Sequence, residues 1–302
     1  MLGWLAASAH ADILYASNPG LNVIDKFNSN DSGAVFATTL NQPSGLAFDS
    51  AGNLYVADYG SNVIEKHTSN RVGSLFATTG LLGPKGVAFD NAGNLYAANY
   101  FNSTVEKFTP GGVKSVFMNS GLSSPTGLAF DSAGNLYVAN KGSNTIAKFT
   151  SGGLGSVFAS IGLNSPQGLA FDTAGNLYVA NQGSNSVAKF NAAGVGSVFA
   201  NSGLSAPIGL AFDSAGNLYV ANQELGGNRT IEKFTPGGFG AVFITTGTTP
   251  AEFLAFTDDA GVPLKLANQV PEPSTFAILA LGIPALLGFH RHRASDGTLT
   301  ER

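Results

Sequence analysis

One carboxylate recurs at a fixed spacing along this chain and is the first group that could do chemistry. The spacing is 41 residues each time. Carboxylate oxygens suit calcium, so a ring of Ca²⁺ sites is one interpretation, although one carboxylate per repeat supplies too few ligands. We expect instead that these side chains cap their own turns, as short polar side chains at hairpin corners do. The recurring residues are Asp49, Asp90, Asp131, Asp172 and Asp213.

A second polar set follows the next apolar run of each repeat, and we expect it to cap turns in the same way. Its members are Asp58, Asn99, Asn140, Asn181 and Asn222. The sequence therefore names no metal ligand and no required cofactor, and calcium is kept as the alternative.

A lysine also recurs once per repeat. A ring of lysines could bind an acidic polysaccharide, whereas the alternative is that solvated lysines protect outer strands from pairing with other chains. We favour the alternative because an acidic residue directly precedes four of the lysines, at positions 25, 65, 106 and 232. The lysines are Lys26, Lys66, Lys107, Lys148, Lys189 and Lys233.

A few residues depart from the repeat, and a functional residue should do so. His67 occupies a slot that holds Phe in other repeats, and we expect a half-buried histidine with its polar atoms satisfied. An insertion lengthens the fifth full repeat, and acidic residues gather in the irregular last unit. Insertions on one face of a repeat protein often hold its binding site, with neutral drift as the alternative. The candidate ligand-binding residues are Glu224, Asn228, Arg229, Glu252, Asp258 and Asp259.

The residues of common catalytic sites do not occur together. His67 is the one histidine inside the repeats, and the chain has no cysteine. A histidine acid/base pair and a thiol nucleophile are therefore unavailable. No catalytic residue is predicted, and the sequence favours binding over catalysis.

Composition describes a large, weakly charged core. Hydrophobic residues make up 44% of the chain and charged residues only 11%, with a net charge of −4. Nucleic-acid binding needs a basic face that neutralises phosphates, and the sequence has no such face. Nucleic acid is therefore excluded as a partner.

Each repeat contains four short apolar runs separated by turn residues. In the third repeat these runs are Leu128–Phe130, Leu136–Ala139, Thr145–Phe149 and Ser156–Ala159. Runs of this length with Gly between them predict a four-stranded antiparallel sheet. Apolar residues stand at successive positions, so both faces of the sheet must be covered, as in a propeller blade. The recurring phenylalanines are expected to form the core.

The ends of the repeat region predict six blades. The chain enters at a second strand, Ile13–Asn18, and leaves with a first strand, Phe253–Thr257, followed by a degenerate strand at Leu264–Asn268. The last first strand should pair with the amino-terminal strands and close the ring, which protects the sheet edges. The fold class is thus all-β: a six-bladed β-propeller of four-stranded antiparallel blades, followed by a short C-terminal hydrophobic helix.

The pattern PxGLAFDxAGNLYVANxxSNxIxKF resembles the NHL repeat, and more loosely the gluconolactonase-like and virginiamycin B lyase propellers. The resemblance implies a six-bladed propeller. Gluconolactonase-like enzymes hold a divalent metal with Glu, Asn and Asp from different blades, and those ligands have no residue-by-residue match here. The lyase pattern requires a catalytic histidine, and histidines are rarer in these repeats than that pattern leads us to expect.

The carboxy-terminal segment resembles the PEP-CTERM sorting signal. A Pro-Glu-Pro motif precedes an apolar stretch, Phe276–Phe289, and a basic stop. The resemblance implies export, anchoring in the inner membrane, and processing by an exosortase. The product would then reach the cell surface or extracellular matrix of a Gram-negative bacterium, commonly with exopolysaccharide. The sorting residues are Val270, Pro271, Glu272, Pro273, Arg291 and Arg293.

We therefore expect four segments: a remnant of a secretion signal at 1–11, the propeller at 12–268, the sorting segment at 269–293 and a tail at 294–302. Ala9-His10-Ala11 resembles a signal-peptide cleavage site, and we expect the true start to lie upstream. The favoured function is a non-enzymatic surface or matrix scaffold that contacts exopolysaccharide or a surface protein. The alternative is a metal-dependent lactonase-like or lyase-like enzyme.

Overall fold

The computed structural model describes residues 12–28, 33–223, 229–246 and 250–264. Contacts divide the chain into two compact units, Met1–Gln269 and Val270–Arg302, and every described residue lies in the first. The described part consists of strands and one 3₁₀ turn, η1 (Gln182–Ser184), without an α-helix. The predicted sorting residues and secretion remnant lie outside the described residues, so their domain boundaries stay predictions.

The strands form six separate four-stranded antiparallel sheets, which we number as blades 1 to 6. In each blade the first strand is named first. Blade 1 contains β24 (Leu254–Thr257), β1 (Ile13–Asn18), β2 (Val23–Phe27) and β3 (Gly33–Ala37). Blade 2 contains β4 (Pro43–Phe48), β5 (Leu54–Asp58), β6 (Val63–His67) and β7 (Gly73–Ala77). Blade 3 contains β8 (Pro84–Phe89), β9 (Leu95–Asn99), β10 (Thr104–Phe108) and β11 (Lys114–Met118).

The remaining blades repeat the same order. Blade 4 contains β12 (Pro125–Phe130), β13 (Leu136–Asn140), β14 (Thr145–Phe149) and β15 (Gly155–Ala159). Blade 5 contains β16 (Pro166–Phe171), β17 (Leu177–Asn181), β18 (Ser186–Phe190) and β19 (Gly196–Ala200). Blade 6 contains β20 (Pro207–Phe212), β21 (Leu218–Asn222), β22 (Thr230–Phe234) and β23 (Gly240–Thr245).

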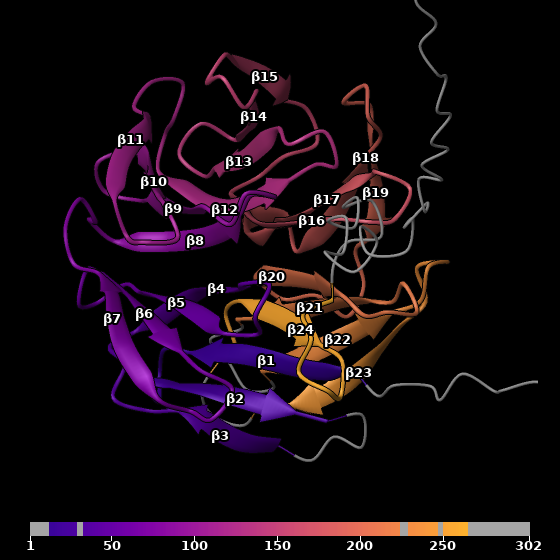
Figure 1. Cartoon of the computed structure of the whole chain (residues 1–302). Coiled ribbons are helices and arrows are strands. Elements are labelled where there is room, and N and C mark those ends of the chain that lie inside the picture. The colour runs from indigo at the N-terminus through magenta and orange to yellow at the C-terminus, as the bar shows by residue number, and fades with distance from the viewer. Residues whose placement is uncertain (1–11, 29–32, 224–228, 247–249, 265–302) are drawn as a thin grey trace, which may run out of the picture. The chain divides into compact units, whose positions relative to one another are not determined.

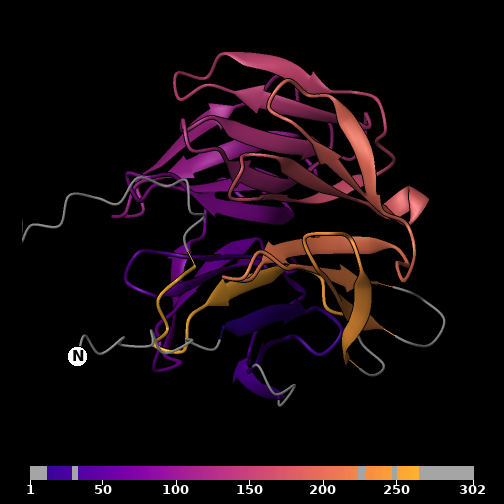
Figure 2. The same ribbon diagram turned by 90° about the vertical axis from the view of Figure 1, so that its right-hand side faces the viewer.

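The six first strands contact one another in a closed circle, β4–β8–β12–β16–β20–β24 and back to β4. They are therefore the inner strands of a propeller, and Figures 1 and 2 show the blades arranged around them. The ring closes where β24 pairs with β1, with Leu14 opposite Phe256. This confirms the predicted propeller and its closure. At the predicted degenerate strand, Leu264 belongs to no named strand, and the residues after it lie outside the described ones.

Aromatic side chains fill the spaces between neighbouring blades. In blade 4 the ring of Tyr137 meets Phe158 of its own blade and Phe171 of blade 5, with centroids 4.9 and 5.0 Å apart and edge-to-face geometry. All five residues of β13 are buried, so both faces of the sheet are covered. The predicted phenylalanine core is confirmed, and it is shared between blades.

Glycine at the third position of the Pro-x-Gly motif lets the inner strands approach closely. A Cβ on Gly127 would lie 2.3 Å from the carbonyl oxygen of Gln167 in the next blade. The corresponding glycines of four other blades make the same approach. In blade 1, Phe253 occupies this position, and its N–H donates to Ser17 Oγ at 2.9 Å.

The repeating Asp caps its own hairpin, as predicted. Asp131 Oδ1 accepts hydrogen bonds from the N–H groups of Ala133 and Asn135. Lys148, in contrast, does not protect an outer edge. Its Nζ lies 3.6 Å from Asp131 Oδ2 and 5.0 Å from the centre of the Tyr137 ring. The predicted edge-protecting role is wrong, because the lysine lies on the third strand and pairs across the blade.

The Asn set does more than cap its own turn. Asn140 Oδ1 accepts from the N–H of Ser123, and Asn140 Nδ2 donates to the carbonyl of Gly121. Both partners belong to the connection that enters the blade from its neighbour. The side chain also contacts Thr145 in its own turn. The prediction of a local cap was therefore incomplete: Asn140 fixes the connection between two blades.

His67 is fully buried rather than half-buried, with 3% of its surface exposed. Its Nε2 lies 3.1 Å from Glu65 Oε2, within ion-pair distance but not in hydrogen-bonding geometry. Burial lowers the pKa of His67 and raises the pKa of Glu65, so both neutral forms are favoured. Together with Arg71 they line a cavity of about 690 Å³ between blades 1 and 2.

Candidate functional site

The residue between Pro and Gly at the start of the inner strand differs in each of blades 2 to 6, and in blade 1 the matching residue is Glu252, between Ala251 and Phe253. Its neighbours repeat almost without change, because Pro opens the strand and Gly permits the close approach described above. Since the inner strands form a circle, these residues gather at one end of the propeller axis. We call them the axial ring: Ser44, Lys85, Thr126, Gln167, Ile208 and Glu252.

A second variable position follows the Asp or Asn that ends the second strand in blades 2 to 6. The connection from the second to the third strand begins here, at the same end of the blade as the axial ring. These residues are half-buried, whereas most of the axial ring is buried. We call them the loop ring: Tyr59, Tyr100, Lys141, Gln182 and Gln223.

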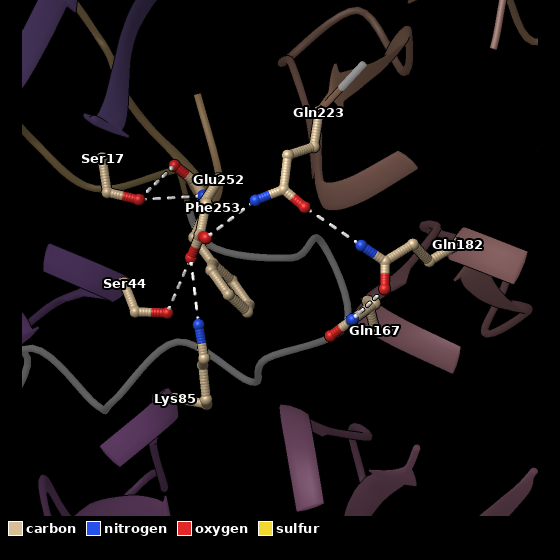
Figure 3. A network of polar contacts seen from close by, with 8 residues as sticks. All are labelled: Ser17, Ser44, Lys85, Gln167, Gln182, Gln223, Glu252 and Phe253. Atoms are coloured by element: carbon tan, nitrogen blue, oxygen red, sulfur yellow. Dashed lines mark hydrogen bonds and ion pairs between the residues drawn. The ribbon is translucent and has the colours of Figure 1, made fainter. Parts of the chain in front are cut away.

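Hydrogen bonds join the two rings along one side. Gln167 Nε2 donates to Gln182 Oε1 at 2.7 Å, and Gln182 Nε2 donates to Gln223 Oε1 at 3.0 Å. Gln223 Nε2 in turn donates to Glu252 Oε1 at 3.2 Å. Figure 3 shows these side chains from blades 5, 6 and 1 directed toward one another in a chain.

Glu252 is the last residue in this series of hydrogen bonds and the charged member of it. Only 7% of the residue is exposed. Its Oε2 accepts from Ser44 Oγ at 3.2 Å and from Lys85 Nζ at 3.3 Å. The carboxylate therefore has donors from three other blades, which offsets the cost of burying a charge.

Blades 2 to 4 supply a different chemistry, which we call the cationic sector: Tyr59, Lys85, Tyr100, Phe101 and Lys141. The Lys85 ammonium lies 4.3 Å from the centre of the Tyr59 ring, a cation–π contact. Phe101 lies 5.6 Å from Tyr59 and 5.4 Å from Tyr100 between ring centroids, and 60% of it is exposed.

The charges of these groups act on one another's pKa. The pKa of Lys141 is lowered by burial and by the charge of Lys85, and the charge of Glu252 opposes that shift. The pKa of Tyr59 is raised by burial first, and then by Tyr100 and Glu252. Among the described residues Lys141 makes no hydrogen bond or ion pair, whereas Lys85 makes both with Glu252. The sector therefore combines the partly desolvated ammonium of Lys141 with aromatic rings from blades 2 and 3.

The axial ring does not fit a divalent cation of the kind that gluconolactonase-like propellers hold. Glu252 already has a lysine ammonium on Oε2, where a cation would need a free carboxylate oxygen. Within the described ranges, no three His, Asp or Glu side chains are placed together so that they could hold a metal ion.

The structure separates the candidate ligand-binding residues predicted from the sequence. Glu252 belongs to the axial ring, but Asp258 caps the turn that follows β24 by accepting from the N–H of Val262, and Asp259 is exposed in the same turn. Six residues of extended chain, about 20 Å, separate them from Glu252. Glu252 thus lies apart from Asp258 and Asp259, and a ligand-binding role for each of them stays a prediction. Of the predicted loop, Arg229 accepts through its carbonyl from Thr246, and Glu224 and Asn228 lie outside the described residues.

The sequence prediction missed most of both rings because it searched for insertions and acidic residues. The signal was present as single-position variation inside a constant frame. The triplets Pro-Ser-Gly, Pro-Lys-Gly, Pro-Thr-Gly, Pro-Gln-Gly and Pro-Ile-Gly differ only in the middle. A position-by-position comparison of the repeats would have found it.

Comparison with known families identifies both parts of the sequence. The NHL repeat matches residues 40–64 and 122–149. The PEP-CTERM protein-sorting motif matches residues 269–294 and implies export, membrane anchoring before processing, and processing by an exosortase. No curated protein gives a significant match to the sequence.

Solved propellers share the fold at low identity. A chain of a nidogen/laminin complex is 20% identical with a TM-score of 0.72, covering 82% of this chain and 98% of that one. Virginiamycin B lyase from Staphylococcus aureus is 15% identical with a TM-score of 0.59, covering 72% and 77%. A gluconolactonase from Xanthomonas campestris is 20% identical with a TM-score of 0.62, covering 70% and 79%.

At these identities the solved structures show that the fold is shared and nothing more. Among the described residues, no helix has the length and apolar character needed to cross a membrane. The chain is a six-bladed β-propeller in which two segments match the NHL repeat, and its residues 269–294 match the PEP-CTERM protein-sorting motif.

Proposed function

We propose that this chain is a non-enzymatic binding module that works outside the cell and holds its ligand at the end of the propeller that carries the two rings. The ligand is exopolysaccharide at the surface or in the matrix of a Gram-negative bacterium. The observation that supports this is the concentration of variable side chains at one end of an otherwise regular repeat. A structural residue obeys the repeat, whereas a binding residue must differ between blades to recognise an asymmetric ligand.

The chemistry of the two rings is consistent with binding. They combine amides, aromatic rings and a few charges, which is typical of sites that recognise polar ligands without reacting with them. The carboxylate of Glu252 accepts three hydrogen bonds from Ser44, Lys85 and Gln223. That arrangement orients the carboxylate and engages both of its oxygens with groups of the protein itself.

The test is binding of the producing bacterium's own exopolysaccharide to the purified full chain. Tyr100→Ala and Gln182→Ala in the loop ring should each weaken binding about threefold to tenfold. Leu154→Ala is the matched control, because its exposed side chain lies on the β14–β15 hairpin at the opposite end of blade 4. Equal affinity in all three variants would overturn the proposed site. Turnover of a lactone, or cleavage of the polymer, would favour the enzymatic alternative.

Sorting can be tested separately from binding. The motif implies processing by an exosortase, so Glu272→Ala should leave the precursor uncleaved in the membrane fraction. Asp259→Ala serves as the control, since it removes one acidic residue from an exposed turn. Release of the Glu272→Ala variant to the cell surface at the normal rate would contradict this part of the proposal.

A further inference from the structure

The axial end of the propeller is chemically divided. Blades 5 and 6 contribute amides that bond to one another and to Glu252. Blades 2 to 4 contribute the cationic sector. We infer that the cationic sector binds an anionic sugar residue of the polysaccharide, with the acidic group at Lys141 and the sugar ring against Tyr59 and Phe101. This inference rests on the proposed function and specifies the charge class of its ligand.

Lys141 is the group that selects charge. It follows β13, is half-buried, and its charge interacts with the charges of both Lys85 and Glu252. Lys85 already pairs with Glu252 at 3.3 Å, so that carboxylate is committed. Lys141 is influenced by the charge of this carboxylate but makes no ion pair with it among the described residues. An anion placed beside Lys141 would balance the remaining charge and would be held by a charge-assisted hydrogen bond.

The aromatic side chains provide the adjoining surface. Tyr59 and Phe101 come from neighbouring blades and lie 5.6 Å apart between centroids, with their planes inclined by 39°. Gly83 lies directly against both rings, so the surface has backbone support. Phe101 is 60% exposed although it sits beside two other aromatic rings. Rigid aromatic faces of this kind pack against the apolar face of a ring-shaped ligand at low entropic cost.

The same surface disfavours a cationic ligand. Lys85 occupies the face of Tyr59 at 4.3 Å and also the carboxylate of Glu252. A cation would therefore meet two positive charges, and Lys85 already occupies one face of Tyr59. A neutral sugar could use the aromatic surface but would leave Lys141 unpaired.

The experiment uses the full chain and three commercial polymers: polygalacturonate, dextran sulfate and neutral dextran. Dextran sulfate and dextran share one backbone, so they differ in charge, while polygalacturonate separates carboxylate from sulfate. Binding is measured by calorimetry at low and at high salt. Both anionic polymers should bind at least about tenfold more tightly than dextran, and salt should weaken them because exposed charges are screened.

Variants assign the effect to the sector. Lys141→Gln should lower the affinity for both anionic polymers about tenfold. Lys114→Gln, which removes an equal charge from outer strand β11, should not lower it. The double variant Tyr59→Ala/Phe101→Ala should weaken all polymers, and the exposed Phe239→Ala on the β22–β23 hairpin should weaken none. Thermal unfolding confirms that each variant is folded.

The outcomes separate this inference from the proposed function. One outcome is that dextran binds as tightly as dextran sulfate and that only Tyr59→Ala/Phe101→Ala loses affinity. That result would overturn the inference that the ligand is anionic, but it would support the proposed binding site. Equal loss in Lys141→Gln and Lys114→Gln would show attraction by overall charge and would also overturn the inference. If no polymer binds, or if no variant of either ring changes binding, the site and the inference fail together.

Discussion

Lys85 and Glu252 lie 167 positions apart in the chain, yet the lysine Nζ donates to the glutamate Oε2 at 3.3 Å. Their inner strands, β8 and β24, belong to blades 3 and 1, and β4 lies between them in the ring. The ion pair therefore reaches past blade 2 at the axis. It joins the hydrogen-bonded amides of blades 5 and 6 to the cationic sector, so the two halves of the site are coupled through one carboxylate.

Glu252→Gln should change stability and anion binding in opposite directions. Removing the carboxylate leaves Lys85 partly buried without its partner, which should lower the free energy of unfolding by about 1–3 kcal/mol after allowance for partial exposure. The same change adds one unit of positive charge, so the affinity for dextran sulfate should rise. Thermal unfolding and calorimetry measure the two effects.

Asp259→Asn is the matched control, because it makes the same change of net charge in an exposed turn. It should alter neither quantity by more than a small amount. A Glu252→Gln variant of unchanged stability would mean that the ion pair contributes nothing to holding the blades together.

The fold could be predicted because each blade repeats the same short sequence motifs. Asp131 and Gly134 form a hairpin that depends only on neighbouring residues, and the repeat displays that hairpin several times. The closing pair of β24 with β1 followed from the incomplete units at the two ends. Lys148 was misinterpreted because its partner, Asp131, follows a strand two positions away in the sheet, and no acidic residue stands beside Lys148 in the sequence.

The site was harder to predict because it depends on which blades meet at the axis. Glu252 looked like part of a cluster with Asp258, since the two are close in sequence. An inner strand runs along the axis, and so it carries its two ends to opposite faces of the propeller. Glu252 therefore joins Lys85 and Gln223, which no local pattern connects to it.

Gly127→Ala should be strongly destabilising. The new Cβ would lie 2.3 Å from the carbonyl oxygen of Gln167 and 3.0 Å from the Cα of Gly168, and backbone atoms cannot move aside as a flexible side chain can. We expect a loss of about 3 kcal/mol, as for severe overpacking. Chemical denaturation of the full chain measures it.

Gly152→Ala is the control within the same blade, because its added Cβ meets only Thr150 Oγ1 at 3.9 Å. Its stability should stay within about 0.5 kcal/mol of the parent, the usual range for surface positions. Equal effects in the two variants would show that the inner strands can separate without cost.

His67→Phe should stabilise the protein, and more so in acid. The slot holds Phe108, Phe149, Phe190 and Phe234 in other blades, and each is nearly or fully buried. At about pH 8, where His is neutral, we expect a gain of roughly 1 kcal/mol from added apolar burial. Because burial lowers the pKa of His67, the unfolded state binds a proton more readily than the folded state as pH falls.

That difference costs the parent protein stability once the pH falls below the unfolded pKa of about 6.5. The gain in His67→Phe should therefore be larger at about pH 5 than at about pH 8. Glu65 has the opposite sign, since its raised pKa costs stability as pH rises, and it is present in both proteins together with Arg71. Parallel unfolding curves at several pH values measure the difference. A constant gain would mean that His67 does not titrate differently on folding.

Two outer strands should promote self-association of the protein. Lysine substitutions on these strands should reduce it. Strands β15 and β19 each pair on one side only, and their central Val157 and Val198 are each 66% exposed. Uncharged edge strands of this kind offer free backbone groups to another chain.

The double variant Val157→Lys/Val198→Lys should scatter less light at high protein concentration, without loss of thermal stability. It changes the net charge from −4 to −2, and a charge nearer zero normally favours association. Reduced scattering would therefore come from the edges themselves. Leu154→Lys, at an exposed turn beside β15, should not reproduce it, and equal reduction there would refute the role of the edge strands.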